Sequence, residues 1–330
     1  MTPPSFELIC PAGTPAALRA AVEAGADAVY IGFRDATNAR NFPGLNFDRA
    51  DARNAIAFVR ERGRKLFLAI NTLPRAGNPE AWHRAVDDAA ALGADAVILA
   101  DIGLLDYAAR RHPDLRLHLS VQASAANADA IRLYRDAFGV RRVVLPRVLT
   151  VADIAALNRG IDVETEVFVF GGMCPMAEGR CSLSSYATGR SPNKDGVCSP
   201  PGHVRYEPRN GDMVSQLGGF TINRFGPHEP AGYPTLCKGR FVAEGKSSYL
   251  FEEPTSLNAL DLLPDLKAAG VRALKVEGRQ RGAAYVGTVV RGLRTALDAF
   301  ERGETINPSR FLDLTEGGTA TTGAYGKTWR

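Results

Sequence analysis

Short apolar runs alternate with amphipathic segments along most of this chain. The run 7–10 stops at a Pro-Ala-Gly turn, and Thr14 followed by Pro15 predicts the start of a helix, because threonine caps helix N-termini and proline suits the first turn. Apolar positions within 18–25 form one stripe of that helix and end at a glycine. A second apolar run, 28–32, follows at once. The pattern predicts a strand, a helix and a second strand at the start of the chain.

The same unit recurs further along. The segment 24–29, Ala-Gly-Ala-Asp-Ala-Val, reappears at 92–97 as Leu-Gly-Ala-Asp-Ala-Val. Runs of Val, Ile and Leu are typical of parallel strands that are buried on both faces. Eight such strands are predicted, at about 6–10, 28–33, 65–71, 96–100, 115–121, 142–146, 164–170 and 271–277. Eight strands with intervening helices predict an α/β fold, a (β/α)8 TIM-type barrel or a variant of it. An open doubly wound sheet is the alternative, although no glycine-rich dinucleotide fingerprint follows the first strand.

The connection between strands seven and eight is unusually long. Residues 172–256 are rich in Gly, Pro, Ser and Asn and show little helical periodicity, and they hold four of the five cysteines. A long irregular connection in a compact domain is either functional or disordered. We expect a single barrel domain, 1–310, that includes this cysteine-rich insertion. A helix is predicted at about 282–302, and 311–330 is expected to be a flexible tail.

Composition narrows the class of protein. The chain has 330 residues, 45% hydrophobic and 23% charged, which is typical of a globular protein. The net charge of +4 is too small to indicate a nucleic-acid binder, so nucleic acid is not expected as a partner. No apolar stretch is long enough to span a bilayer, and the N-terminus has no signal-peptide pattern. We therefore expect a cytoplasmic protein, in which thiols stay reduced.

Polar residues at the carboxyl ends of the predicted strands are candidates for substrate binding, because active sites of such barrels lie at that rim. Arg34 and Asp101 are at strand ends, and 38–41 lies in the loop after the second strand. For each residue alone, a loop cap or a surface charge is the alternative role. Together, several arginine and amide groups would suit a small anionic substrate. The candidates are Asn71, Gln122, Arg147, Glu277 and Arg279.

The insertion carries Cys174, Cys181, Cys198 and Cys237. Disulfides conflict with a reducing compartment. Structural zinc usually takes cysteines in close pairs, which are absent here. A [4Fe–4S] cluster needs four thiolates, which can come from separate loops, and flanking glycines would let the backbone approach it. Zinc, a cluster and unrelated inert thiols therefore stay open at this point. Cys10 ends the first strand and is expected to be a small buried apolar side chain.

The segment 166–184, Glu-Val-Phe-Val-Phe-Gly-Gly-Met-Cys-Pro-Met-Ala-Glu-Gly-Arg-Cys-Ser-Leu-Ser, resembles the signature of peptidase family U32. Gly172 is the one departure, where the family has Ser or Ala. Segments 9–13, 40–42 and 191–193 add to the resemblance, which extends over essentially the whole chain and is strongest to the branch that serves oxygen-independent ubiquinone biosynthesis.

The resemblance implies a function. In that branch the four matching cysteines hold a [4Fe–4S] cluster, which assigns Cys174, Cys181, Cys198 and Cys237 to iron here. The implied activity is O2-independent hydroxylation of a ubiquinone precursor, with prephenate as the oxygen donor. The implied partners are a UbiV-like U32 paralogue in a heterodimer and a lipid-carrier protein.

Two other activities occur or are named in the family. Some members hydroxylate tRNA or rRNA, and these are longer than this chain. Others are named as peptidases, but the chain lacks the His-Glu-x-x-His and Gly-x-Ser-x-Gly patterns, and only a pair such as Cys181 and His203 suggests a protease. RNA hydroxylation is the main alternative, and proteolysis ranks below it.

Overall fold

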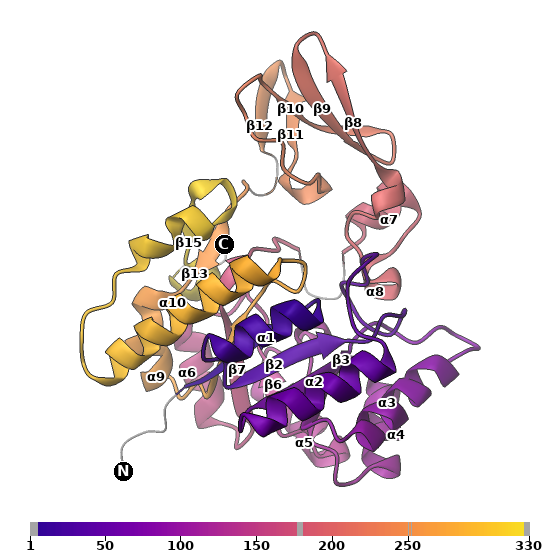
Figure 1. Ribbon diagram of the computed structural model, residues 1–330, viewed down its shortest axis with the longest axis vertical. Coiled ribbons are helices and arrows are strands. Elements are labelled where there is room, and N and C mark those ends of the chain that lie inside the picture. Colours follow the sequence, from indigo (N-terminus) through magenta and orange to yellow (C-terminus); the bar gives the residue numbers. More distant parts are fainter. Residues whose placement is uncertain (1–5, 177–180, 250, 252, 327–330) are drawn as a thin grey trace.

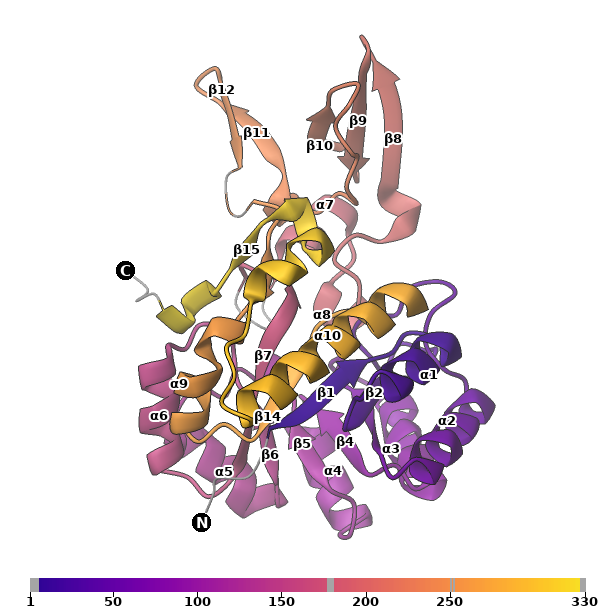
Figure 2. The ribbon, with the colours of Figure 1, turned by 60° about the vertical axis from the view of Figure 1, so that its left-hand side comes forward.

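The eight predicted strands close into a barrel in the computed structural model, which describes residues 6–176, 181–249, 251 and 253–326 (Figures 1 and 2). Each strand pairs in parallel with the next, and β14 pairs with both β1 and β7, which closes the ring. The predicted (β/α)8 fold is confirmed. The barrel strands are β1 (Glu7–Pro11), β2 (Ala28–Gly32), β3 (Lys65–Ile70), β4 (Ala96–Leu99), β5 (Leu117–Leu119), β6 (Arg142–Val144), β7 (Glu164–Gly172) and β14 (Ala273–Val276).

Helices cover the outside of the barrel. Side chains cap several of them as the sequence suggests: Thr14 Oγ1 accepts from Ala17 N at 3.2 Å, and Asp101 Oδ1 accepts from Leu104 N at 2.9 Å. The predicted helix 282–302 is confirmed as α10. The helices are α1 (Pro15–Glu23), α2 (Arg49–Glu61), α3 (Glu80–Leu92), α4 (Ile102–Arg111), α5 (Ala128–Phe138), α6 (Val151–Arg159), α9 (Leu263–Ala268) and α10 (Ala283–Glu301).

Charged side chains fill the barrel interior away from the mouth. The guanidinium of Arg142 is 5% exposed and pairs with Glu7, with Glu164 at 2.7 Å and with Glu166 at 3.4 Å. Glu166 is fully buried and also accepts a hydrogen bond from Lys275 Nζ at 2.6 Å. Buried charges persist only when they are paired and hydrogen-bonded. This network therefore forms a rigid floor beneath the mouth of the barrel.

The insertion, residues 172–256, contains regular structure that its composition did not predict. Its first part forms short helices, α7 (Leu183–Thr188) and α8 (Pro192–Asp195). Two small antiparallel sheets then stand away from the barrel (Figure 2): β8 (Val204–Arg209), β9 (Asp212–Leu217) and β10 (Phe220–Phe225), and β11 (Arg240–Ala243) with β12 (Lys246–Tyr249). The Asn210-Gly211 turn between β8 and β9 has positive φ at both residues, which is typical of a two-residue hairpin turn. Residues 177–180, within the signature segment, lie outside the described residues.

The described part of the segment expected to be a flexible tail, 311–326, packs against the barrel and the insertion. It contains β15 (Ala320–Thr321), which pairs with β13 (Ser256–Asn258), and β13 in turn pairs with β7. Glu316 joins the insertion to the barrel by ion pairs with Lys238 and, at 3.1 Å, with Arg281. Residues 327–330 of that predicted tail lie outside the described residues. In the described part of the chain, no helix is both long and apolar enough to cross a membrane.

The buried pair under the mouth leads to a stability prediction. Replacing Lys275 with Met leaves the Glu166 carboxylate buried without its ammonium partner, which should lower the free energy of unfolding by about 3–5 kcal/mol. Lys65→Met is the matched control, because the Lys65 side chain is 57% exposed and its partner Glu7 keeps Arg142. Its cost should stay below about 1 kcal/mol.

Urea unfolding followed by circular dichroism measures both variants. Adding Glu166→Leu to Lys275→Met should recover much of the loss, since it removes the buried carboxylate that has lost its lysine partner, while Arg142 keeps Glu7 and Glu164. Equal effects of Lys275→Met and Lys65→Met would contradict the assignment of a buried charged floor.

Candidate functional site

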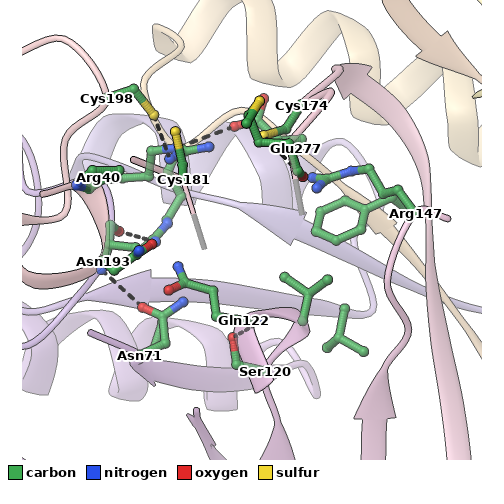
Figure 3. A pocket seen from close by; sticks show the side chains of 18 of the residues that line it. Arg40, Asn71, Ser120, Gln122, Arg147, Cys174, Cys181, Asn193, Cys198 and Glu277 are labelled. Carbon is green, nitrogen blue, oxygen red and sulfur yellow. Dashed lines mark hydrogen bonds and ion pairs between the residues drawn. The ribbon is translucent and has the colours of Figure 1, made fainter. Parts of the chain in front are cut away.

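A cavity of ≈150 Å³ lies between the barrel mouth and the insertion (Figure 3). Tyr30, Phe168 and Lys275 form its floor, and the ends of the barrel strands form its walls. Residues of the insertion roof it. A cavity of this size holds a single six-membered ring. All four cysteines of the insertion line it: Cys174, Cys181, Cys198 and Cys237.

The end of β7 brings Cys174 to the mouth. Gly171 has φ +119°, and a Cβ there would lie 2.6 Å from the carbonyl oxygen of Glu277. Only glycine allows this backbone conformation and this close approach. The strand therefore runs directly beside Glu277, and Cys174 emerges next to that carboxylate, as Figure 3 shows.

Cys198 is placed by a contact between the insertion and the loop that joins β2 to α2, residues 33–48, called here the β2–α2 loop. Arg40 N donates to Gly196 O at 2.6 Å, and a Cβ on Gly196 would lie 2.7 Å from Asn38 O. A second contact, from Leu73 N to Asn193 O at 3.1 Å, fixes the same part of the insertion to the loop after β3. These contacts hold the roof against the rim.

The remaining two cysteines come from short elements. Cys181 precedes α7, and Cys237 lies in the 3₁₀ turn Leu236–Lys238. Burial raises the pKa of the Cys237 thiol to about 11, the Thr235 hydroxyl lowers it, and Cys174 and Cys198 raise it further. A thiol with this pKa is protonated at neutral pH, so metal binding there must displace a proton.

The four thiols line one cavity without converging on a single point. The five cysteines are thiols and not disulfides. Among residues 6–176, 181–249, 251 and 253–326, no three His, Cys, Asp or Glu side chains converge closely enough to hold one metal ion. Four thiols around one larger cavity are nevertheless the donor set that a four-iron cluster needs. Ser184 Oγ, which is buried in the same lining, makes no hydrogen bond within the described residues and is available to such a group.

All five rim candidates line this cavity: Asn71, Gln122, Arg147, Glu277 and Arg279. The Arg147 guanidinium lies 3.8 Å from the centre of the Phe168 ring, which forms part of the floor. The Glu277 carboxylate pairs with Arg40 at 3.7 Å. Gln122 follows β5 on a 3₁₀ turn and contributes to the wall. A ligand in the cavity would therefore contact Arg147, Glu277 and Gln122.

Asn71 and Arg279 are also engaged in holding the β2–α2 loop. Asn71 Oδ1 accepts from Ala39 N at 3.0 Å, while Arg279 donates to Asn38 Oδ1 at 3.0 Å and to Ala39 O. Burial lowers the pKa of Arg279 to about 10, so it remains charged at neutral pH.

Arg34 and Asp101, the other strand-end residues, do not line the cavity. Arg34 pairs with Asp51 at the surface, at 3.1 Å, and Asp101 caps α4. Cys10 is fully buried in the core, where burial raises the pKa of its thiol.

Several cavity residues were not among the predicted candidates: Tyr30, Ser120, Asn193 and Lys275. For Lys275 a signal existed, because it lies two positions after Ala273 on a strand whose alternate side chains point into the barrel. No sequence signal reveals Arg40 as a neighbour of the thiols, because that contact depends on how the insertion folds back.

Known proteins resemble this chain over most of its length. The tRNA hydroxylation protein P of Escherichia coli (strain K12) is 29% identical over 330 residues, covering 94% of this chain and 72% of that protein. The 23S rRNA 5-hydroxycytidine C2501 synthase of the same organism is 30% identical over 309 residues, covering 92% of this chain and 41% of that protein. The solved structure of the U32 peptidase Mk0906 has a TM-score of 0.44 at 15% identity, covering 52% of this chain and 72% of that one.

A sequence profile of peptidase family U32 matches residues 13–319. The match runs from the turn after β1 to the residue before β15, so it includes the other seven barrel strands, the insertion and the four thiols. The matched range agrees with the resemblance to this family that the sequence shows over essentially the whole chain. The chain therefore belongs to peptidase family U32.

Proposed function

We propose that this chain is the [4Fe–4S]-binding subunit of a hydroxylase that works without O2. The observation that carries the proposal is the set of four thiols on one cavity at the barrel mouth. Relatives named for hydroxylation of tRNA and for synthesis of 5-hydroxycytidine in rRNA support the reaction class. Proteolysis is not proposed, because the thiols that would act as nucleophiles are assigned to iron.

Cys174, Cys181, Cys198 and Cys237 would hold the cluster at the roof of the cavity. When bound, a [4Fe–4S] cluster supplies electron transfer one electron at a time. The chain's own residues would position the reactants below it. The barrel and the insertion together line the cavity.

The floor and wall suit an aromatic ring together with an anionic oxygen donor. Tyr30 and Phe168 present rings, and Arg147 lies over the Phe168 ring. A guanidinium binds a carboxylate through a planar fork. The ammonium of Lys275 lies 3.9 Å from the centre of the Tyr30 ring and adds positive charge at the floor. A carboxylate donor such as prephenate matches this charge. In such a transfer the C–O bond of the donor would break and a C–O bond to the substrate ring would form. The substrate would be oxidised by two electrons, and the donor, which would gain hydrogen in place of its hydroxyl, would be reduced by two.

A ubiquinone precursor is the proposed substrate. The support is the resemblance of segments 9–13, 40–42 and 191–193 to the ubiquinone branch of the family, together with a cavity sized for one ring. The same resemblance supports a heterodimer with a UbiV-like U32 paralogue and delivery of the precursor by a lipid-carrier protein.

A nucleotide of tRNA or rRNA is the second candidate substrate. The relatives named for hydroxylation of tRNA and for synthesis of 5-hydroxycytidine in rRNA favour RNA over the quinone precursor. They also count against the expectation from net charge that nucleic acid is not a partner. A pyrimidine base flipped out of its stack presents a single ring to such a cavity.

The cluster assignment predicts a composition. The chain purified without oxygen should contain about four iron and four sulfide per chain and a broad visible absorption. Replacing Cys174 with Ala should remove most of the iron, since the cluster loses one of its four ligands. Iron, zinc and sulfide analysis with visible spectroscopy measures both proteins.

Cys10→Ala is the matched control, because Cys10 is buried in the core of the barrel and does not line the cavity. It should keep the iron content of the parent. A colourless protein with stoichiometric zinc, or full iron retention in Cys174→Ala, would contradict the cluster assignment.

The substrate is tested in cells that lack the gene. Without oxygen, loss of the protein should abolish ubiquinone while hydroxylated RNA nucleosides stay at the parental level, and a plasmid with the intact gene should restore the quinone. Mass spectrometry of quinones and of nucleosides measures both. Normal quinone together with a missing RNA hydroxyl would replace the first candidate substrate by the second.

A further inference from the structure

Arg40 adopts a backbone conformation that arginine normally avoids. Its φ is +81°, in the left-handed region where side chains other than those of Gly, Asn and Asp are disfavoured. Three hydrogen bonds fix this conformation: Arg40 N donates to Gly196 O, Phe42 N donates to Arg40 O at 3.0 Å, and Asn46 Nδ2 donates to Arg40 O at 3.0 Å. Strained residues that surrounding structure holds in place cluster at functional sites.

The guanidinium of Arg40 lies beside a thiol and a carboxylate that line the same cavity. Arg40 Nη1 donates to Cys198 Sγ at 3.9 Å, and Arg40 Nε lies 3.7 Å from Glu277 Oε1 (Figure 3). The side chain is 29% exposed. Burial disfavours its charge, but Cys198, Glu277 and Cys174 together raise the pKa of Arg40 above its ordinary value. Arg40 is thus a fixed positive charge that faces two of the proposed cluster ligands.

A fixed positive charge and an N–H donor at a cluster ligand affect the two redox states unequally. Reduction adds one negative charge to the cluster, so Arg40 stabilises the reduced state more than the oxidised state. Hydrogen bonds to cluster sulfurs are among the features that set the potential of such clusters. Glu277 has the opposite sign of charge on the same side and should favour the oxidised state.

We propose that Arg40 is a positioning residue that donates an N–H to the Cys198 thiolate and thereby raises the reduction potential of the cluster. The proposal rests on the proposed cluster function. It assigns the strained conformation in the β2–α2 loop to this contact. It also assigns Glu277 the opposite effect, because its negative charge lowers the reduction potential of the cluster. A change of charge in the cavity would therefore change that potential.

The test is a redox titration of the reconstituted protein, followed by electron paramagnetic resonance. Arg40→Asn removes the guanidinium and keeps a residue that tolerates the left-handed conformation. It should lower the equilibrium constant for reduction at least tenfold, which is about 59 mV for a one-electron couple. Arg40→Lys keeps the charge without the planar fork and should shift the potential less. Glu277→Gln should shift it in the opposite direction.

Arg34→Gln is the control, because Arg34 belongs to the same loop but pairs with Asp48 and Asp51 at the surface. It should leave the potential unchanged. A parent protein without iron would overturn both the cluster function and this inference. If the parent holds the cluster and its potential is unchanged in Arg40→Asn and in Arg40→Lys, this inference alone is overturned. If Arg40→Asn cannot hold iron, Arg40→Gln removes the same charge, and an unshifted potential in that variant has the same meaning.

Discussion

The contact between the Arg40 N–H and the Gly196 carbonyl is the interaction on which the site depends. It joins the mouth of the barrel to the insertion at 2.6 Å, and the glycine leaves no Cβ to separate the two segments. Without it, the thiol of Cys198 would not be held over the cavity. Asn71 and Arg279 support the same contact from below, since both bond to the β2–α2 loop. The part of the insertion that covers the cavity is therefore held in place by the loops of the barrel.

The floor of the cavity is fixed in a different way. Glu166, Arg142 and Lys275 form buried ion pairs that fill the interior beneath the mouth. Burying such a network costs more free energy than burying apolar side chains, because each charge must be desolvated. It places a lysine at the base of a cavity whose walls carry arginine. The chain thus offers positive charge from two directions to a ligand that lies under the thiols.

The barrel was predictable because its strands are buried on both faces and therefore appear as continuous apolar runs. The five rim candidates all reached one cavity for a geometric reason: parallel strands end at the same edge. The hairpins of the insertion were not predicted, since their strands are short, polar and half exposed. The binding of Asn71 and Arg279 to the β2–α2 loop, and the contact of Arg40 with Cys198, were also beyond prediction. They join residues far apart in the sequence and depend on the folded insertion.

The proposed site depends on four thiols that together hold one iron–sulfur cluster over the barrel mouth. Anomalous diffraction from crystals grown without oxygen, recorded at the iron and zinc edges, can locate the metal. One compact iron-edge peak is expected within bonding reach of Cys174, Cys181, Cys198 and Cys237. A zinc-edge peak at these thiols, or iron bound elsewhere in the barrel, would contradict it.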